Sequence, residues 1–189
     1  MQNSHLRKIM FWGAIILFAL ATLWINYVVK MNIQGGGRGG VVSAMGNVKI
    51  GQVAPDFSTL DLSNRTVSLS SYRGQKVVLL DFWATWCGPC RLEMISLQTL
   101  QEKYQNQGLE ILSLNQGEDA ELVRQFITRK KYGFHVLLDA AGAVNNLYGV
   151  RGIPTLVLVD KAGVVQRLEV GYAEDPSALG KKIETLLQK

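Results

Sequence analysis

The sequence predicts an α/β domain in which helices cover both faces of one mixed sheet, preceded by a single transmembrane helix. From residue 51 onward, strand-like and helix-like segments alternate, and a hairpin and a closing helix follow. Residues 76–83, KVVLLDFW, are almost continuously apolar, as expected for a strand buried on both faces. Residues 9–29 form an uncharged apolar run of 21 residues, long enough to span roughly 30 Å of bilayer hydrocarbon as a helix.

The apolar run at residues 9–29 is predicted to be an uncleaved anchor that follows a short tail, residues 1–8. The apolar part of a cleaved signal peptide usually has only about 7 to 15 residues. The first small-residue site that resembles a cleavage signal, Val42-Ser43-Ala44, lies far beyond the run.

The basic excess of the chain surrounds this predicted anchor. The formal net charge is +5, yet residues 51–189 contain 15 basic and 15 acidic residues. Anionic lipid is therefore the expected partner of the excess charge, and nucleic acid is not an expected partner. Basic residues occur on both sides of the run, so the positive-inside rule hardly discriminates between orientations. We expect the usual arrangement, with the short N-terminal tail in the cytoplasm and the domain on the extracytoplasmic (periplasmic) side.

Residues 30–50 are predicted to be a glycine-rich tether between the anchor and a domain at residues 51–189. Gly35-Gly36-Gly37-Arg38-Gly39-Gly40 has the composition of a nucleotide-binding loop. Such a loop requires a soluble strand before it and a helix after it, and the sequence indicates neither.

The elements of the domain follow from periodicity and end signals. Strands are predicted at residues 57–60, 66–69, 76–83, 109–115, 136–138, 155–159 and 164–170. A helix begins just after Cys87, carries Met94, Leu97 and Leu100 at helical spacing, and ends at Gly108.

Three further helices are predicted. Residues 119–131 start with acidic residues and end with basic ones, which suits the helix dipole. Residues 143–148 form a short helix. Asp175 as N-cap and Pro176 in the first turn open a final helix. Its predicted buried residues are Leu179, Ile183, Leu186 and Leu187.

The two cysteines, Cys87 and Cys90, allow several interpretations. A structural zinc site needs four ligands, and the only histidines are His5 and His135, so no metal is expected. Covalent haem attachment needs a histidine at position 91, which is Arg91. A structural disulfide would close a loop of about four residues, where the loop-closure contribution is smallest.

A working dithiol is the interpretation that the residues favour. Cys87 lies at a strand-to-helix junction, where free backbone N–H groups and the helix dipole favour a thiolate. Cys90, one turn further on, is placed to attack a mixed disulfide at Cys87. Pro89 suits the first turn of a helix.

The motif around the cysteines, FWATWCGPC, resembles the active-site segment of thioredoxin-fold proteins. Together with APDF at residues 54–57 and GVRGIPT at residues 149–155, it is similar to the membrane-anchored TlpA/ResA-like thiol-disulfide oxidoreductases, over about residues 50–189. This resemblance implies a thioredoxin-like fold with an N-terminal hairpin and an inserted helix-strand element, which residues 119–138 fit.

The resemblance also implies roles for individual residues. Cys87 matches the nucleophile, Cys90 the resolving cysteine, and Glu93 an acidic residue near the pair. Pro154 matches a cis-proline that helps to hold an extended substrate segment. The candidate substrate-contacting residues are Trp86, Gly88, Pro89, Ile153 and Pro154.

Two positions depart from the family pattern. Asp81, six residues before Cys87, stands where these anchored proteins often have Asn. Inside an apolar run its pKa should be raised, which makes it a usable proton acceptor for Cys90. Ile95 stands where the family usually has a Pro that kinks the helix, so a straighter or differently kinked helix is expected.

The predicted function is disulfide reduction by a membrane-anchored oxidoreductase with no cofactor beyond the redox-active Cys87–Cys90 pair. The resemblance implies a protein disulfide substrate, with apocytochrome c as the first class, and a membrane electron donor of the thiol-disulfide type. An anchored peroxiredoxin is an alternative, although Thr85 and the loop do not match the usual frame of a peroxidatic cysteine. A thiol-based metal carrier or binding module is another, although no Met-rich or His-rich tract supports it.

Overall fold

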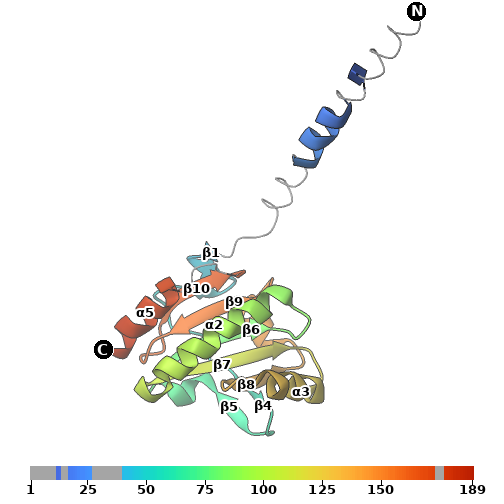
Figure 1. Ribbon diagram of the computed structural model, residues 1–189. Coiled ribbons are helices and arrows are strands. Elements are labelled where there is room, and N and C mark those ends of the chain that lie inside the picture. Colours follow the sequence, from blue (N-terminus) through green and yellow to red (C-terminus); the bar gives the residue numbers. More distant parts are fainter. Residues whose placement is uncertain (1–11, 14–16, 27–39, 173–176) are drawn as a thin grey trace, which may run out of the picture. The chain divides into compact units, whose positions relative to one another are not determined.

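A computed structural model describes residues 12–13, 17–26, 40–172 and 177–189 of the chain (Figure 1). Residues 12–13 and 17–26 are helical. Within the described residues, no helix is both long and apolar enough to cross a membrane. The predicted tail, residues 1–8, lies outside these residues, as do parts of the predicted anchor, residues 9–11, 14–16 and 27–29.

In the described part of the chain, one eight-stranded sheet forms the centre of the domain. Its strands, in spatial order, are β1 (Gly40–Val41), β10 (Val165–Val170), β9 (Thr155–Val159), β6 (Val77–Trp83), β7 (Leu109–Gln116), β8 (His135–Asp139), β4 (Ser58–Asp61) and β5 (Thr66–Ser68). The β6–β7 and β7–β8 pairs are parallel and the others are antiparallel, so the predicted mixed sheet is confirmed.

The described helices of the domain are η1 (Leu69–Tyr72), α2 (Gly88–Tyr104), η2 (Gln105–Gln107), α3 (Ala120–Lys130), α4 (Ala143–Tyr148) and α5 (Ser177–Leu187). The two short 3-10 helices, η1 and η2, were not predicted, and α2, α3 and α4 begin within one residue of the predicted positions. Asp119 caps α3, because its Oδ1 accepts hydrogen bonds from the backbone N–H groups of Glu121 and Leu122. The α2 helix continues through Ile95 without a break. The predicted cap of the last helix, Asp175 and Pro176, lies outside the described residues.

The alternation of side chains along β6 divides the core into two clusters. Val77, Leu79 and Trp83 pack with residues of α2, α3 and α5 on one face, which we call the α2 face. Val78, Leu80 and Phe82 pack on the opposite face, together with α4. All seven residues of β6 are buried. Helices α2, α3 and α5 cover one face of the sheet (Figure 1), and α4 packs on the other, which confirms the predicted cover on both faces.

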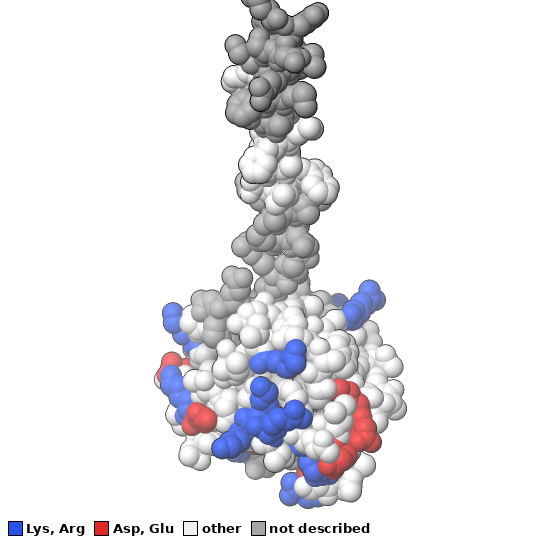
Figure 2. Space-filling view, turned by 45° about the vertical axis from the view of Figure 1, so that its right-hand side comes forward, with Lys and Arg blue, Asp and Glu red and all other residues white. Residues whose placement is uncertain are grey.

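Charges of both signs share the surface. On the face that Figure 2 presents, basic groups gather near the centre, and acidic groups lie towards the margins beside further basic groups. This distribution agrees with the equal numbers of acidic and basic residues in residues 51–189.

Residues 40–50 belong to the folded domain, so the predicted tether, residues 30–50, is wrong over this part. β1 pairs with β10, and β2 (Ala44–Met45) pairs with β3 (Val48–Lys49). Val48 is buried, and the turn before it lies against the end of α4. A Cβ added to Gly46, whose φ is +53°, would lie 2.8 Å from the Cα of Gly149, so only glycine permits this approach. Strands of two residues are too short to produce a readable alternation.

Candidate active site

The two cysteines lie where the central strand β6 gives way to α2. Cys87 is the N-cap of α2, and Cys87 and Cys90 form a disulfide with a Cα–Cα distance of 5.3 Å. The Cys87 Sγ accepts a hydrogen bond from the backbone N–H of Cys90 at 3.2 Å. Cys87 is only 4% exposed and Cys90 is fully buried. A thiolate at the start of this 17-residue helix is stabilised by the dipole and by local N–H groups.

The predicted substrate-contacting residues come from two segments. Trp86 is 69% exposed, Pro89 is exposed and Gly88 is half-buried, so all three present surface beside the cysteines. Pro154 is buried, and its peptide bond with Ile153 is cis, as the resemblance implies. The next residue, Thr155, pairs with Phe82 near the end of β6, so the sheet register brings this segment towards the cysteine loop.

Asp81 is fully buried in β6. Its side chain lies on the α2 face, because residues two apart in a strand point to the same side and Leu79 and Trp83 lie on that face. The hydroxyl of Ser113 donates a hydrogen bond to Asp81 Oδ2 at 2.9 Å. Its Oδ1 has no hydrogen-bond partner in the described part of the chain. Burial raises the pKa of Asp81 well above its ordinary value, and the hydrogen bond from Ser113 opposes this shift only in part. Such a carboxylate can accept a proton near neutral pH.

Glu93 is buried as well, although it lies only two turns into α2. Its Oε2 has no hydrogen-bond partner within the described residues. Burial raises the pKa of Glu93 strongly, and the negative charges of Asp81 and Glu169 raise it further. Glu93 is therefore not an ordinary solvated carboxylate on a helix surface. Glu93 and Asp81 are two buried acids, and burial favours the protonated form of each.

No cluster of three or more potential metal ligands occurs in the residues that the structure describes. His135, the histidine considered for a zinc site, instead interacts with two carboxylates. Its Nε2 lies 3.1 Å from Asp61 Oδ2, and its Nδ1 lies 3.7 Å from Glu110 Oε1. It therefore belongs to a polar contact between β4, β7 and β8.

Comparison with known proteins places this arrangement in a family. A model of the AhpC/TSA family matches residues 50–168. The chain belongs to this family. It is 44% identical over 124 residues to the thiol-disulfide oxidoreductase ResA of Geobacillus thermodenitrificans, covering 66% of this chain and 71% of the relative. It is 41% identical over 127 residues to the thioredoxin-like protein YneN of Bacillus subtilis, covering 66% and 73%.

Solved structures give the same result for the fold. A crystal structure from Chlorobium tepidum, assigned as the thiol:disulfide interchange protein DsbE, superposes with a TM-score of 0.70 at 35% identity. The match covers 75% of this chain and 99% of that chain. The thioredoxin domain of a thiol-disulfide oxidoreductase from Bacteroides vulgatus superposes with a TM-score of 0.64 at 26% identity, covering 75% and 99%. The chain is thus a thiol-disulfide oxidoreductase with a thioredoxin-like fold.

In the oxidoreductase, Glu118 contacts the segment before Cys87, and the sequence analysis missed this residue. Glu118 Oε2 accepts hydrogen bonds from the backbone N–H of Thr85 at 2.6 Å and from Asn115 Nδ2 at 2.7 Å. Its Oε1 accepts from the Thr85 hydroxyl at 2.5 Å. Glu118 follows β7, which is parallel to β6, so the ends of both strands lie at the same edge of the sheet. The predicted parallel strands were therefore the signal that could have placed Glu118 near the cysteine loop.

Glu169 is a second buried acid that the sequence analysis did not single out. It is 3% exposed and forms an ion pair with Arg167 on the same strand. In the VQRLEV segment of β10, Glu169 lies between the apolar residues Leu168 and Val170, and this was the sequence signal.

Proposed function

We propose that the chain is an extracytoplasmic, membrane-anchored enzyme that reduces disulfide bonds in proteins. The observation that supports it best is the CGPC pair at the start of α2, with Cys90 buried and two protonatable carboxyl groups, Asp81 and Glu93, on the same face. The exchange needs no cofactor other than the cysteine pair.

The proposed reaction has two steps. The thiolate of Cys87 attacks a substrate disulfide, which forms a mixed disulfide and releases one substrate thiolate. Cys90, deprotonated by Asp81, then attacks Cys87 Sγ. This attack releases the second substrate thiolate and forms the Cys87–Cys90 disulfide. Two electrons pass to the substrate, and a membrane donor of the thiol-disulfide type restores the reduced pair. Apocytochrome c is the substrate class that the family resemblance favours.

Anchoring rests on the apolar run at residues 9–29. Within it, residues 17–26 are helical and carry the large apolar side chains of Leu17, Phe18, Leu20, Leu23, Trp24 and Ile25. Insertion into a bilayer would remove these side chains from water. We place the N-terminus in the cytoplasm of a bacterial cell and the domain outside.

Reduction of insulin by the full chain in detergent tests the proposal. Wild type should reduce insulin in the presence of a thiol donor, and the Cys87→Ser variant should not. A Cys90→Ser variant should accumulate a mixed disulfide, and mass spectrometry of material trapped in cells then identifies the partner. Equal insulin reduction by wild type and Cys87→Ser would refute the proposal, and rapid consumption of peroxide instead would favour the peroxiredoxin alternative.

A further inference from the structure

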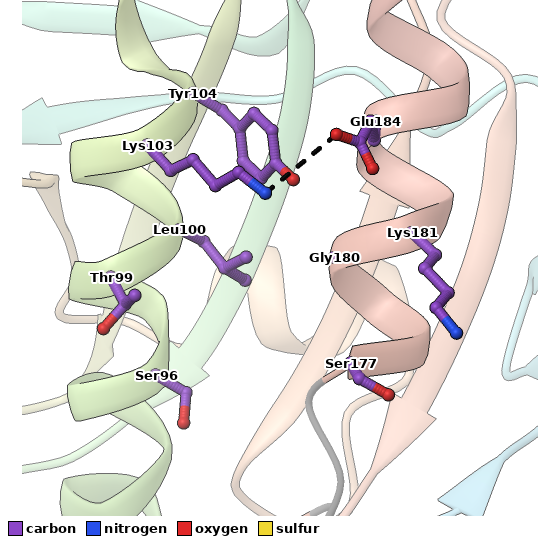
Figure 3. A pocket seen from close by; sticks show the side chains of 9 residues that line it. All are labelled: Ser96, Thr99, Leu100, Lys103, Tyr104, Ser177, Gly180, Lys181 and Glu184. Carbon is purple, nitrogen blue, oxygen red and sulfur yellow. Dashed lines mark ion pairs between the residues drawn. The ribbon is translucent and has the colours of Figure 1, made fainter.

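A groove separates α2 from α5 on the α2 face (Figure 3). It has a volume of about 530 Å³. The side chain of Leu100 points into the space between the helices, and Gly180 leaves room on the opposite side. At one end, Lys103 Nζ lies 4.0 Å from Glu184 Oε1, so an ion pair spans the two helices there.

A small cavity adjoins the inner side of this groove. Ser96 and Leu100 line both spaces, which places the cavity next to the groove. Glu93, Glu169 and Tyr172 also line the cavity, which has a volume of about 10 Å³. That volume is close to the minimum for one water molecule, and the polar groups around it supply the hydrogen-bond partners that such a water needs. The cavity therefore places two buried carboxyl groups next to the groove.

The sheet register connects these carboxyl groups with Asp81. Glu169 pairs with Leu156, and Leu156 pairs with Asp81 on the next strand. Leu156 belongs to the core cluster of the α2 face and lines the cavity with Glu93 and Glu169. Asp81 and Glu169 are thus two strands apart, roughly 9 to 10 Å, on one face of the sheet. Glu93 responds to both charges, since each of them raises its pKa.

We propose that the proton given up by Cys90 leaves the site through the groove between α2 and α5, from Asp81 by way of Glu93 and Glu169. When a substrate is attached to Cys87, the exposed side of the dithiol beside Trp86 is covered by that substrate. The groove approaches the buried acids from between the helices and stays open to solvent. This inference rests on thiol-disulfide exchange at the cysteine pair and does not depend on membrane anchoring or on the net direction of the reaction.

The transfer balances at each step. The Cys90 thiol gives its proton to the Asp81 carboxylate, and the resulting thiolate attacks Cys87 Sγ while the substrate sulfur leaves as a thiolate. Glu93, which is already protonated, takes up this proton from Asp81 while it passes its own proton through water in the small cavity to Glu169. A proton then leaves Glu169 for solvent, and Asp81 is again a carboxylate. Arg167 pairs with Glu169, and Tyr172 lines the cavity. Lys103, Lys181 and Glu184 are the charged residues that line the groove.

Replacement of Glu169 in the full-length oxidoreductase tests the path. A positioned acid–base group contributes roughly 10² to 10⁴-fold to a rate, so the loss of a relay that serves it should slow resolution of the mixed disulfide by about tenfold or more in Glu169→Gln. Imidazole, a small diffusible base, should restore part of the rate, and Glu169→Asp should retain the wild-type pH profile. A Glu169→Gln enzyme with the wild-type rate and pH profile would overturn the proposal.

Obstruction of the groove is an independent test. Ser96→Leu places a bulky side chain where the groove meets the cavity, and it should slow resolution and prevent rescue of Glu169→Gln by imidazole. Thr185→Leu makes the same kind of change on α5 at a position that lines neither space, and it should leave the rate unchanged. Equal rates in the Ser96→Leu and Thr185→Leu enzymes would contradict the path.

A measurement without turnover separates this inference from the proposed function. The infrared band of protonated carboxyl groups in the oxidised protein follows the titration of Glu93. Because the charge of Glu169 is one cause of the raised pKa of Glu93, this titration should move to lower pH in Glu169→Gln. An unmoved titration would count against the path even if the enzyme reduces disulfides, and a moved one would support it even if the physiological direction is oxidation.

Discussion

Asp81 is an ionisable residue in a strand whose every side chain is buried. An apolar neighbourhood of this kind disfavours the charged carboxylate, and the single hydrogen bond from Ser113 compensates for only part of the cost. The sequence alone predicted this raised pKa, because the apolar run on both sides of Asp81 predicts complete burial. The second acid, Glu93, was placed near the cysteines only by family resemblance, and its burial depends on how α2 packs on the sheet.

An Asp81→Asn substitution should stabilise the fold at alkaline pH. The folded-state pKa of Asp81 is raised, so the folded chain holds this proton more tightly than the unfolded chain does. The stability cost is absent below the unfolded pKa and grows as the pH rises through the folded pKa. We expect Asp81→Asn to be more stable than wild type by roughly 1 to 3 kcal/mol at pH 8, in urea unfolding. The difference should shrink as the pH falls towards about 4.

Two comparisons sharpen this prediction. Ser113→Ala removes the hydrogen bond that lowers the pKa of Asp81, so its stability should fall more steeply than that of wild type as the pH rises. Insulin reduction by Asp81→Asn should also be slower, because Cys90 loses its proton acceptor. If Asp81→Asn shows no gain in stability at pH 8, the raised pKa is refuted.

At the scale of elements, the segment between β6 and α2 is held by a residue from another connection. Glu118, after β7, accepts two hydrogen bonds from Thr85 and one from Asn115. Thr85 lies two residues before Cys87, so this contact fixes the approach of the chain to the nucleophile. The position of the thiol thus depends on two parallel strands that end at one edge of the sheet.

Glu118→Ala should destabilise the fold and slow disulfide reduction. Hydrogen bonds to a charged group contribute roughly 1.5 to 3 kcal/mol each, and solvent will replace part of them here, so a loss of about 1 to 3 kcal/mol is expected in urea unfolding. Glu121→Ala is a matched control, because Glu121 forms an exposed pair with Arg124 on α3 and its loss should change stability by less than about 0.5 kcal/mol. Similar effects of the two substitutions would show that Glu118 does not hold the loop.

Each predicted strand, and the short helix at residues 143–148, matches the structure to within one residue at each end, whereas the strands of two residues were not predicted. The predicted strand at residues 76–83 and helix at residues 119–131 match β6 and α3 to within one residue at each end. β1, β2 and β3 have two residues each, and they lie within residues 30–50, which the sequence predicts to be a tether. The buried positions of Glu93 and Glu169 also escaped prediction from the residues, since burial of a carboxyl group follows from tertiary packing that no local pattern encodes.

For the whole molecule, the structure moves the beginning of the folded domain from residue 51 to residue 40 at the latest. A chain of residues 40–189 should therefore be more stable than one of residues 51–189. The shorter chain loses the buried side chains of Val48 and Met45, and full burial of each contributes roughly 1.5 to 3 kcal/mol. We expect the free energies of unfolding of the two chains to differ by at least about 2 kcal/mol in urea unfolding. Equal urea midpoints would show that the folded domain begins at residue 51.

The pairing of β1 with β10 has a further consequence, for solubility. β1 covers one margin of the sheet, and the backbone N–H of Val42 extends this cover by donating to the carbonyl of Leu168. Val165 is hydrogen-bonded to Gly51 and Gln52 instead, so the part of β10 that depends on β1 is Leu168 to Val170. Without β1, the outer backbone groups of these residues would face neighbouring molecules, a common route to edge-to-edge aggregation. β1 thus protects this edge of the sheet, and preparations that begin at residue 51 should scatter more light at high concentration than those that begin at residue 40.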